Sequence, residues 1–245
     1  MKTVIISQAR MTSKRLPGKV LKMVSGKSLL EYQIERLKRS VQSDEIVIAT
    51  TKNETDLPIV ELCEQLKVSY FRGPEEDVLS RYYEAAKEFE ADVVVRVTSD
   101  CPVIDPMVID SVINFFLGGY PVFDYVSNTK KRTFPRGMDA EVISIQTLKE
   151  TFNEATAKPD REHVTSYIKR HSNRYNLGNL SYHENQSSHR WTVDTEEDLE
   201  LVSKIINALY PVKVDFTLKD ILNLVEKNPE WTTINAHIEQ NKYGE

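Results

Sequence analysis

The most constraining feature of this sequence is a repeated exchange between short runs rich in Val and Ile and longer amphipathic segments. The runs cover residues 2–7, 45–50, 68–71 and 92–97. Most are continuously apolar rather than alternating, which is typical of strands covered on both faces, as in parallel sheets. Because strands that alternate with helices are joined by right-handed crossovers, this order predicts a mainly parallel α/β sheet.

The segments between the runs carry recognisable helix starts. Ser28 and Glu31 have the spacing of a capping box, and apolar residues then repeat on one helix side to about residue 37. Further helices are expected from Thr55 or Asp56, over about 75–89, and from Asp105-Pro106 to about 116. In the last of these, Asp105 is the expected N-cap and Pro106 takes the first helical position.

The regular order is interrupted after Gly118-Gly119. Residues 121–190 are richer in turns and polar side chains, with a helix expected over about 160–170. We interpret about 121–185 as an insertion in one domain spanning 1–245. Order returns with an expected strand over 189–193. Helices are then expected over 195–209, where Thr195 and Asp198 have capping-box spacing, and over 217–225.

Composition narrows the class of protein. Of the 245 residues, 40% are apolar and 28% are charged, which is ordinary for a globular protein. No stretch approaches the ~18 apolar residues of a membrane span, and the apolar run from Val4 to Ile6 is too short for a signal peptide. The two cysteines form no disulfide framework or zinc pattern. We therefore expect a cytoplasmic protein with no membrane partner.

Charge is unevenly distributed along the chain. The protein has 32 Lys and Arg against 37 Asp and Glu, a net charge of −5. Residues 1–40 nevertheless contain ten Lys or Arg and only two Glu. A local basic cluster on an acidic protein indicates a small polyanionic ligand rather than a nucleic acid.

The clearest local signal is the segment 8–19, which directly follows the first expected strand. Arg10, Lys14, Arg15 and Lys19 place four cations in ten residues with no acid among them. Ligands of open α/β sheets bind beyond the carboxyl ends of strands, and several cations with close backbone approach suit a triphosphate. The alternative is a solvated basic loop. A P-loop is excluded at Gly26-Lys27-Ser28, because position 21 is not glycine.

Two aspartates follow expected strands. Asp100 comes after the fourth Val-rich run, and Asp194 after the expected strand at 189–193. Mg²⁺ favours one or two carboxylates together with phosphate oxygens, so both are candidate metal ligands. The alternatives are a turn residue for Asp100 and a helix cap for Asp194, unless Thr195 takes that role.

Several segments together resemble a known family. They are Ala9 to Lys19 with its Leu-Pro-Gly-Lys end, Asp100-Cys101-Pro102, residues 136–141, residues 160–165 and residues 191–195. This set resembles the spore coat polysaccharide biosynthesis cytidylyltransferases of the SpsF type, which are related to CMP-KDO and CMP-sialic acid synthetases. The resemblance extends over nearly the whole chain.

The resemblance implies a Rossmann-like fold of the GT-A nucleotidyltransferase type, a mainly parallel sheet flanked by helices with a dimerisation insertion. It implies CTP and an acidic sugar such as a nonulosonic acid as substrates, Mg²⁺ as cofactor, and a homodimer. The implied nucleotide-binding residues are Arg10, Ser13, Lys14, Arg15, Lys19 and Arg72, of which Arg10 and Lys19 are catalytic together with Asp100; the metal ligands are Asp100 and Asp194, and the sugar-binding residues are Arg136, Asp139 and His163.

Two positions depart from the pattern. Ser99 stands where relatives often have Gly, and Met138 lies in the loop expected to choose the sugar. The expected function is transfer of CMP from CTP to an acidic sugar, for a surface or spore-coat polysaccharide. The alternatives are a nucleotidyltransferase acting on a sugar 1-phosphate, a non-catalytic nucleotide-binding protein, and a nucleotide-sugar glycosyltransferase of similar fold. The last commonly uses an Asp-x-Asp motif, which this sequence lacks.

Overall fold

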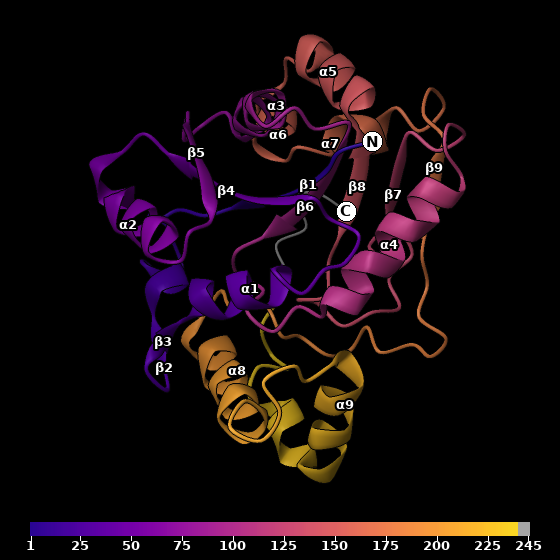
Figure 1. The fold of residues 1–245 in the computed structure, drawn as a ribbon. Coiled ribbons are helices and arrows are strands. Elements are labelled where there is room, and N and C mark those ends of the chain that lie inside the picture. The colour runs from indigo at the N-terminus through magenta and orange to yellow at the C-terminus, as the bar shows by residue number, and fades with distance from the viewer. Residues whose placement is uncertain (240–245) are drawn as a thin grey trace.

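The computed structural model describes residues 1–239 and is built on a seven-stranded sheet in the order β5-β4-β1-β6-β8-β7-β9 (Figure 1). The strands are β1 Thr3–Gln8, β4 Glu45–Thr51, β5 Ser69–Gly73, β6 Val93–Thr98, β7 Tyr125–Ser127, β8 Glu141–Ser144 and β9 Leu177–Asn179. β1, β4, β5 and β6 are parallel, while β8 is antiparallel to both β6 and β7. The predicted mainly parallel sheet is confirmed.

The apolar runs form central strands because both of their faces are covered. Val4 and Ile6 pack into one hydrophobic cluster with Tyr82 of α3, whereas Ile5 packs into a cluster on the opposite face. None of the three β1 side chains is accessible to solvent. This two-sided burial is why the run shows no apolar–polar alternation.

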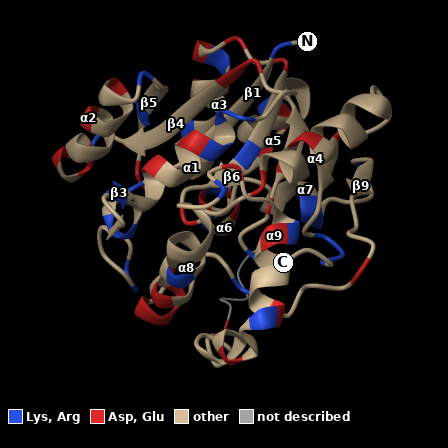
Figure 2. Ribbon diagram, turned by 60° about the horizontal axis from the view of Figure 1, so that its bottom comes forward, with Lys and Arg blue, Asp and Glu red and all other residues tan. Residues whose placement is uncertain are grey.

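Helices lie on both faces of the sheet (Figure 1). One face carries α3 Val78–Glu88, α5 Ile145–Glu154, α6 Lys158–Glu162 and α7 Ser166–Arg170; the other carries α1 Leu29–Leu37, α2 Leu57–Gln65 and α4 Pro106–Gly118. Two short strands, β2 Met23–Val24 and β3 Lys27–Ser28, form a hairpin before α1. Charged residues of both signs are spread over these helices (Figure 2).

A further layer packs beneath α1 (Figure 1). It consists of α8 Glu196–Leu209 and α9 Leu218–Lys227, followed by a 3₁₀ turn at Pro229–Thr233. α8 begins with the predicted capping box, in which Thr195 and Asp198 each accept a hydrogen bond from the other's backbone N–H. Among residues 1–239, no helix combines the length and apolar character that crossing a membrane requires.

The predicted helix starts are largely confirmed. Ser28 caps α1 and Asp105 caps α4, with Pro106 in the first helical position. Asp56 precedes α2, but its side chain makes no cap hydrogen bond. Its carboxylate instead accepts hydrogen bonds from the backbone N–H of Met11 at 2.8 Å and the hydroxyl of Thr51 at 2.5 Å. Asp56 therefore fastens the loop after β1 to the end of β4.

Two expected elements are wrong. Residues 189–193 form no strand, because their backbone bonds go to two loops rather than to a neighbouring strand. Arg136 N–H donates to the carbonyl of His189 at 3.0 Å, and Val193 N–H donates to that of Asp100 at 2.7 Å. The helix expected over 160–170 is divided into α6 and α7 by a non-helical His163, whose φ is −109° and ψ 79°.

Residues 121–185 contribute strands to the same sheet that the first half of the chain builds. β7, β8 and β9 extend it beyond β6, and α5, α6 and α7 pack on the face already covered by α3. The segment 121–185 thereby forms one wall beside the carboxyl end of β6.

Candidate active site

A cleft of about 1420 Å³ opens beyond the carboxyl ends of β1 and β6. These strands are neighbours, and Gln8 is paired with Thr98 at their ends. The loops that follow, 9–19 and 99–105, therefore begin side by side, at the edge where α/β sheets bind ligands. The lining includes twelve Lys and Arg side chains against five Asp and Glu. The cleft is thus strongly positive on a protein whose net charge is −5.

The loop after β1 is folded back on itself. Gly18 has φ +66°, a left-handed conformation that favours glycine, and its N–H donates to the carbonyl of Met11 at 2.9 Å. On the outer side, Glu75 accepts hydrogen bonds from Thr12 and, at 3.5 Å, from Arg10. The closed turn places Lys19 at the start of a 3₁₀ helix that faces the cleft.

Lys19 joins the two strand-following aspartates. Its Nζ lies 3.0 Å from Oδ2 of Asp100 and 2.7 Å from Oδ1 of Asp194. Burial lowers the pKa of Lys19, but attraction to the two carboxylates outweighs it and holds the pKa above its usual value. Burial likewise raises the pKa of Asp100, and attraction to Lys19 overcomes this and lowers it to about 2. Lys19 and Asp100 are therefore charged at neutral pH.

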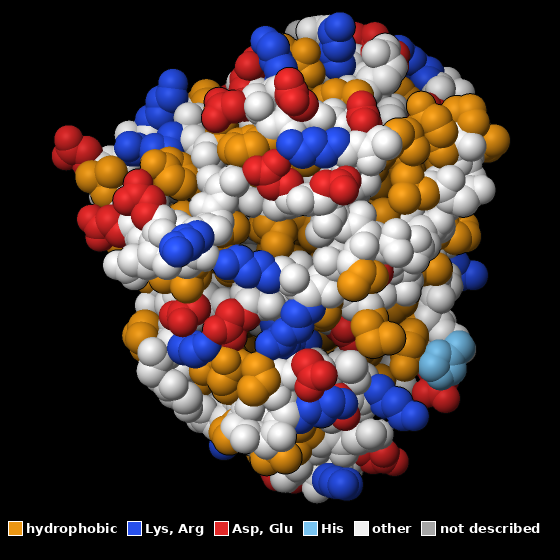
Figure 3. Space-filling view, in the orientation of Figure 1, with side chains coloured by type: hydrophobic (Ala, Val, Ile, Leu, Met, Phe, Trp, Pro, Cys, Tyr) orange, Lys and Arg blue, Asp and Glu red, His pale blue; other side chains and the backbone are white. Residues whose placement is uncertain are grey.

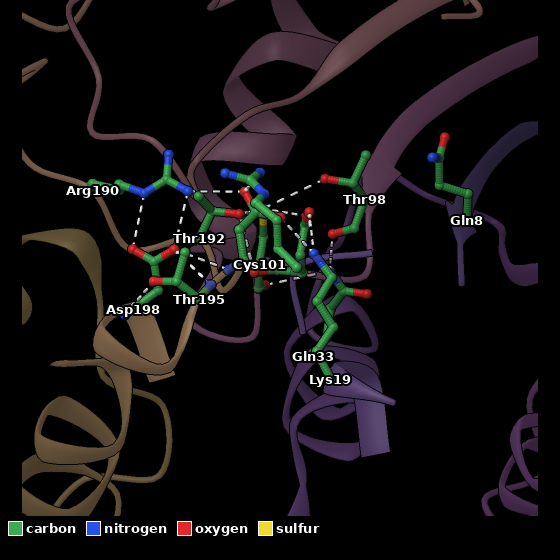
Figure 4. Close-up of polar contacts among 12 residues, drawn as sticks. Gln8, Lys19, Gln33, Thr98, Cys101, Arg190, Thr192, Thr195 and Asp198 are labelled. Carbon is green, nitrogen blue, oxygen red and sulfur yellow. Dashed lines mark hydrogen bonds and ion pairs between the residues drawn. The ribbon is translucent and has the colours of Figure 1, made fainter. Parts of the chain in front are cut away.

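Asp194 is held from several sides. Besides Lys19, its carboxylate receives Arg15 Nη2 at 2.8 Å and Arg190 Nη2 at 2.8 Å. Arg190 also contacts the fully buried Asp198, with Nε donating to Oδ1 at 2.9 Å (Figure 4). Thr195 caps α8, so the carboxylate of Asp194 is left to face the cleft cations.

The opposite wall is formed by the loop before β8 and by α6 and α7. Arg136, Asp139 and His163 all line the cleft here. Asp139 accepts a bidentate pair of hydrogen bonds from Arg132, at 2.6 and 3.0 Å. Buried Glu141 is paired with Arg96 and lies 3.3 Å from Lys169.

The sequence profile of the cytidylyltransferase family matches residues 4–230. The chain belongs to the cytidylyltransferase family. It is 32% identical to the spore coat polysaccharide biosynthesis protein SpsF of Bacillus subtilis over 240 residues, covering 94% of this chain and 96% of SpsF. It is also 32% identical over 142 residues to the 3-deoxy-manno-octulosonate cytidylyltransferase of Chlamydia trachomatis serovar A, covering 56% of this chain and 54% of that protein.

A solved structure agrees with the family assignment. A cytidylyltransferase from Leptospira borgpetersenii superposes with a TM-score of 0.91 at 32% identity, covering 98% of this chain and 99% of that one. The expected resemblance and Rossmann-like nucleotidyltransferase fold are thereby confirmed, and the protein is a nucleotidyltransferase.

The cleft brings together nearly all the residues singled out from the sequence. Those that line it are Arg10, Ser13, Lys14, Arg15, Lys19, Asp100, Arg136, Asp139, His163 and Asp194. Arg72 is the exception, because it does not belong to this lining. Its Nε donates to the carbonyl of Thr51 at 3.0 Å and its Nη2 to that of Asn53 at 3.2 Å, so it braces the ends of β4 and β5.

Several charged residues in and around the cleft had no role predicted from the sequence. Arg96 stands among the valines of β6, and this single charge in a buried strand was the available signal. Glu141 lies inside a motif of the resemblance and Arg190 inside the expected strand at 189–193, but neither had an assigned role. Lys169 had no signal, because the folding of α7 over the end of the sheet brings it to Glu141.

The acidic residues of the cleft fit a divalent cation that is bound together with substrate phosphate. Among residues 1–239, no three His, Cys, Asp or Glu side chains form a metal-binding group. Asp100 and Asp194 nevertheless each direct an oxygen at the same ammonium group. Two carboxylates already holding one cation are the sparse oxygen set that Mg²⁺ accepts when substrate phosphates complete its coordination.

Proposed function

We propose that this protein transfers CMP from CTP to an acidic sugar of the nonulosonic acid type, using Mg²⁺ and releasing pyrophosphate. The CMP-sugar formed supplies the synthesis of a surface or spore-coat polysaccharide. The observation that carries the proposal is the contact of one ammonium group, Lys19 Nζ, with the carboxylates of both Asp100 and Asp194. It lies at the end of a closed basic loop, where the triphosphate and the metal would meet.

The basic loop supports the nucleotide half of the reaction. Arg10, Lys14, Arg15 and Lys19 line the cleft together with the hydroxyl residue Ser13. Charge-assisted hydrogen bonds from such cations bind phosphate oxygens strongly. In the proposed reaction a sugar hydroxyl oxygen forms a bond to the α-phosphorus of CTP, and its proton passes to water. The bond from the α-phosphorus to the bridging oxygen breaks, and that oxygen leaves as part of pyrophosphate.

Lys19 and Arg10 are the proposed catalytic cations. Negative charge grows on the phosphate oxygens as the pyrophosphate leaves, and fixed cations placed there lower the barrier by several kcal/mol in comparable sites, about 3 kcal/mol for one donor. Asp100 and Asp194 would hold Mg²⁺, which supplies neutralisation of phosphate charge and polarisation of the attacking hydroxyl when bound. Asp100 also fixes Lys19, so it acts on both groups.

The proposed binding site for the acceptor sugar is the opposite wall of the cleft. Arg136, Asp139 and His163 are proposed to bind the sugar, where Arg136 suits its carboxylate and Asp139 suits its hydroxyl groups. Lys130, Lys158 and Arg170 add positive charge to the same wall. This excess of cations away from the phosphate loop favours an acidic acceptor. Membership of the cytidylyltransferase family disfavours the glycosyltransferase alternative.

A homodimer is also proposed. Exposed apolar side chains gather at the C-terminal end of α4 and in the loop after it (Figure 3), with Phe115 39%, Tyr120 50% and Val122 62% exposed. A second copy of the chain would cover them. Sedimentation of a species of about twice 28.2 kDa at micromolar concentration is expected; a monomer would contradict the dimer and leave the reaction untouched.

The reaction is tested by pyrophosphate release with Mg²⁺. Each of the four nucleoside triphosphates is combined with a panel of nonulosonic acids, KDO and sugar 1-phosphates. Release confined to CTP with an acidic sugar is the expected result, and it would name the sugar. Release with a sugar 1-phosphate alone would assign the other acceptor class. The absence of both release and any nucleotide-dependent rise in melting temperature would refute the proposal.

A further inference from the structure

The polar chain behind Asp194 continues beyond the part of the protein that matches the family. That match ends at residue 230, and Asn235 lies after it. The Asn235 residue is only 4% exposed, and its Nδ2 donates to Asp198 Oδ1 at 2.8 Å and to the carbonyl of Arg190 at 2.9 Å. This side-chain amide therefore contacts two of the residues that hold Asp194, namely Asp198 and Arg190.

Asp198 connects Asn235 to Asp194 through two sets of hydrogen bonds. Its carboxylate pairs with Arg190 (Figure 4). Arg190 in turn donates to Asp194 Oδ2 at 2.8 Å. Oδ2 of Asp198 also accepts from the backbone N–H of Asp194 at 3.0 Å and of Thr195 at 3.2 Å. Asp198 thus fixes both the side chain and the backbone of Asp194. The placement of Asp194, whose carboxylate faces Lys19, therefore depends in part on the orientation of Asp198.

The Asn235 amide is one of several donors to the buried Asp198 carboxylate. Asn235 borders a pocket of about 310 Å³, together with His189, Trp191 and Leu201. Its Nδ2 is oriented by the two hydrogen bonds to Asp198 and to the carbonyl of Arg190. It therefore helps to place Asp198 beside the donors from Arg190 and from the backbone of Asp194 and Thr195.

We infer that Asn235 is a positioning residue for Asp194, acting through Asp198 and Arg190. The C-terminal segment thereby sets the geometry of a carboxylate in the cleft. The consequence for catalysis rests on the proposed function, in which Asp194 holds the metal. Removal of outer partners of metal ligands commonly costs ~10–100-fold in affinity or activity. Because Asn235 lies one contact further out, we expect about a 3–10-fold change.

The test compares Asn235→Ala and the isosteric Asn235→Asp with the control Asn228→Ala. Asn228 lies seven residues earlier in the chain, and its Nδ2 donates to the carbonyl of Leu224 at 2.8 Å rather than to Asp198. Two quantities are measured: hydrogen exchange of the Asp194 and Thr195 amides in the free protein, and binding of Mn²⁺ with CTP by electron paramagnetic resonance.

Both Asn235 variants are expected to speed exchange at these two amides about tenfold and to weaken Mn²⁺ binding in the presence of CTP by about 3–10-fold. Asn235→Asp should be at least as impaired as Asn235→Ala, because it keeps the volume but places a second carboxylate beside Asp198. A merely space-filling role would leave Asn235→Asp close to the wild type. Changes no larger than those of Asn228→Ala would overturn the inference.

The outcomes also separate this inference from the proposed function. If the wild-type protein binds no Mn²⁺ with CTP, the proposed function is what fails. Amide exchange at Asp194 and Thr195 then decides the positioning role by itself, since it needs neither nucleotide nor sugar. Faster exchange in the Asn235 variants supports the role, and unchanged exchange refutes it.

Discussion

Lys19 Nζ lies 2.7 Å from Oδ1 of Asp194, although 175 residues separate them in the chain. Their side chains are only 11% and 14% exposed. The contact joins the loop after the first strand to the segment before α8, and Asp100 closes it from a third direction at 3.0 Å. Lys19 is therefore the cation that both carboxylates share.

Replacing Lys19 should impair both the fold and the reaction. In Lys19→Met, Asp100 and Asp194 lose the ammonium between them, and the growing phosphate charge loses a catalytic cation. We expect kcat to fall by about 10²–10³ and stability to fall by about 1–3 kcal/mol. Pyrophosphate release and urea unfolding measure these effects.

Lys22→Met is the matched control for Lys19→Met. Lys22 is a nearby lysine paired at 3.2 Å with Glu196, whose side chain is 67% exposed. Such surface pairs contribute about 0–1 kcal/mol, so this variant should retain wild-type kinetics. A Lys19→Met enzyme within about tenfold of the wild type would contradict the electrostatic role of Lys19.

Asp100→Ala should abolish turnover while the protein stays folded. Asp100 is proposed to hold the metal and also fixes Lys19, so its loss removes two contributions together. Pyrophosphate release is measured beside circular dichroism and melting temperature. Glu184→Ala, which removes a carboxylate that is 67% exposed and outside the cleft lining, is the control. Activity above about a tenth of the wild type would argue against the metal role.

The Asp100 carboxylate should also make stability depend on pH. Its pKa is about 2 in the folded protein against 3.8 ordinarily, so its contribution is present above about pH 4 and is lost as the pH falls toward 2. The difference in unfolding free energy between the wild type and Asp100→Asn, without metal, should shrink by about 2 kcal/mol between about pH 6 and pH 2. A difference independent of pH would show that Asp100 is not held ionised.

Gly137 is expected to tolerate no side chain. Its φ is +99°, and a Cβ there would lie 2.7 Å from the backbone carbon of Trp191. Gly137→Ala must displace the loop that carries Arg136 from residues 191 and 192. We expect a loss of about 1–3 kcal/mol and a larger rise in KM for the sugar than for CTP.

Gly26→Ala separates backbone strain from steric clash as causes of the stability loss expected for Gly137→Ala. Gly26 has a similar φ of +86°, but a Cβ there meets no atom within 4 Å. It therefore carries the backbone strain without the steric clash and should leave the kinetics unchanged. If both variants lose the same stability and Gly137→Ala keeps the wild-type KM for the sugar, close contact with Trp191 is not what positions Arg136.

The sequence predicted the elements whose burial is local. The continuous apolar character of residues 4–6 indicated a strand covered on both faces, and Thr195 with Asp198 indicated the start of α8. The strand expected over 189–193 fails because its apolar residues are buried against α8 and α9 rather than within the sheet. Apolar pattern reports burial, and it does not report which backbone groups will pair.

The candidate site was predictable where its residues follow strands, and less so where they meet through the fold. Asp100 and the basic loop were placed by the rule that ligands bind at carboxyl ends of strands. The contacts from Asn235 to Asp198 and from Lys169 to Glu141 join distant segments. They depend on how α8, the C-terminal segment and α7 pack, which no local spacing encodes.

The imbalance of charge between the cleft and the rest of the molecule has a kinetic consequence. Twelve cations against five acids line the cleft, while the whole chain has more acids than cations. An approaching anion is repelled by most of the surface and attracted to the mouth of the cleft, so its diffusional encounters are guided there. Added salt should slow capture of the nucleotide far more than it hastens its escape.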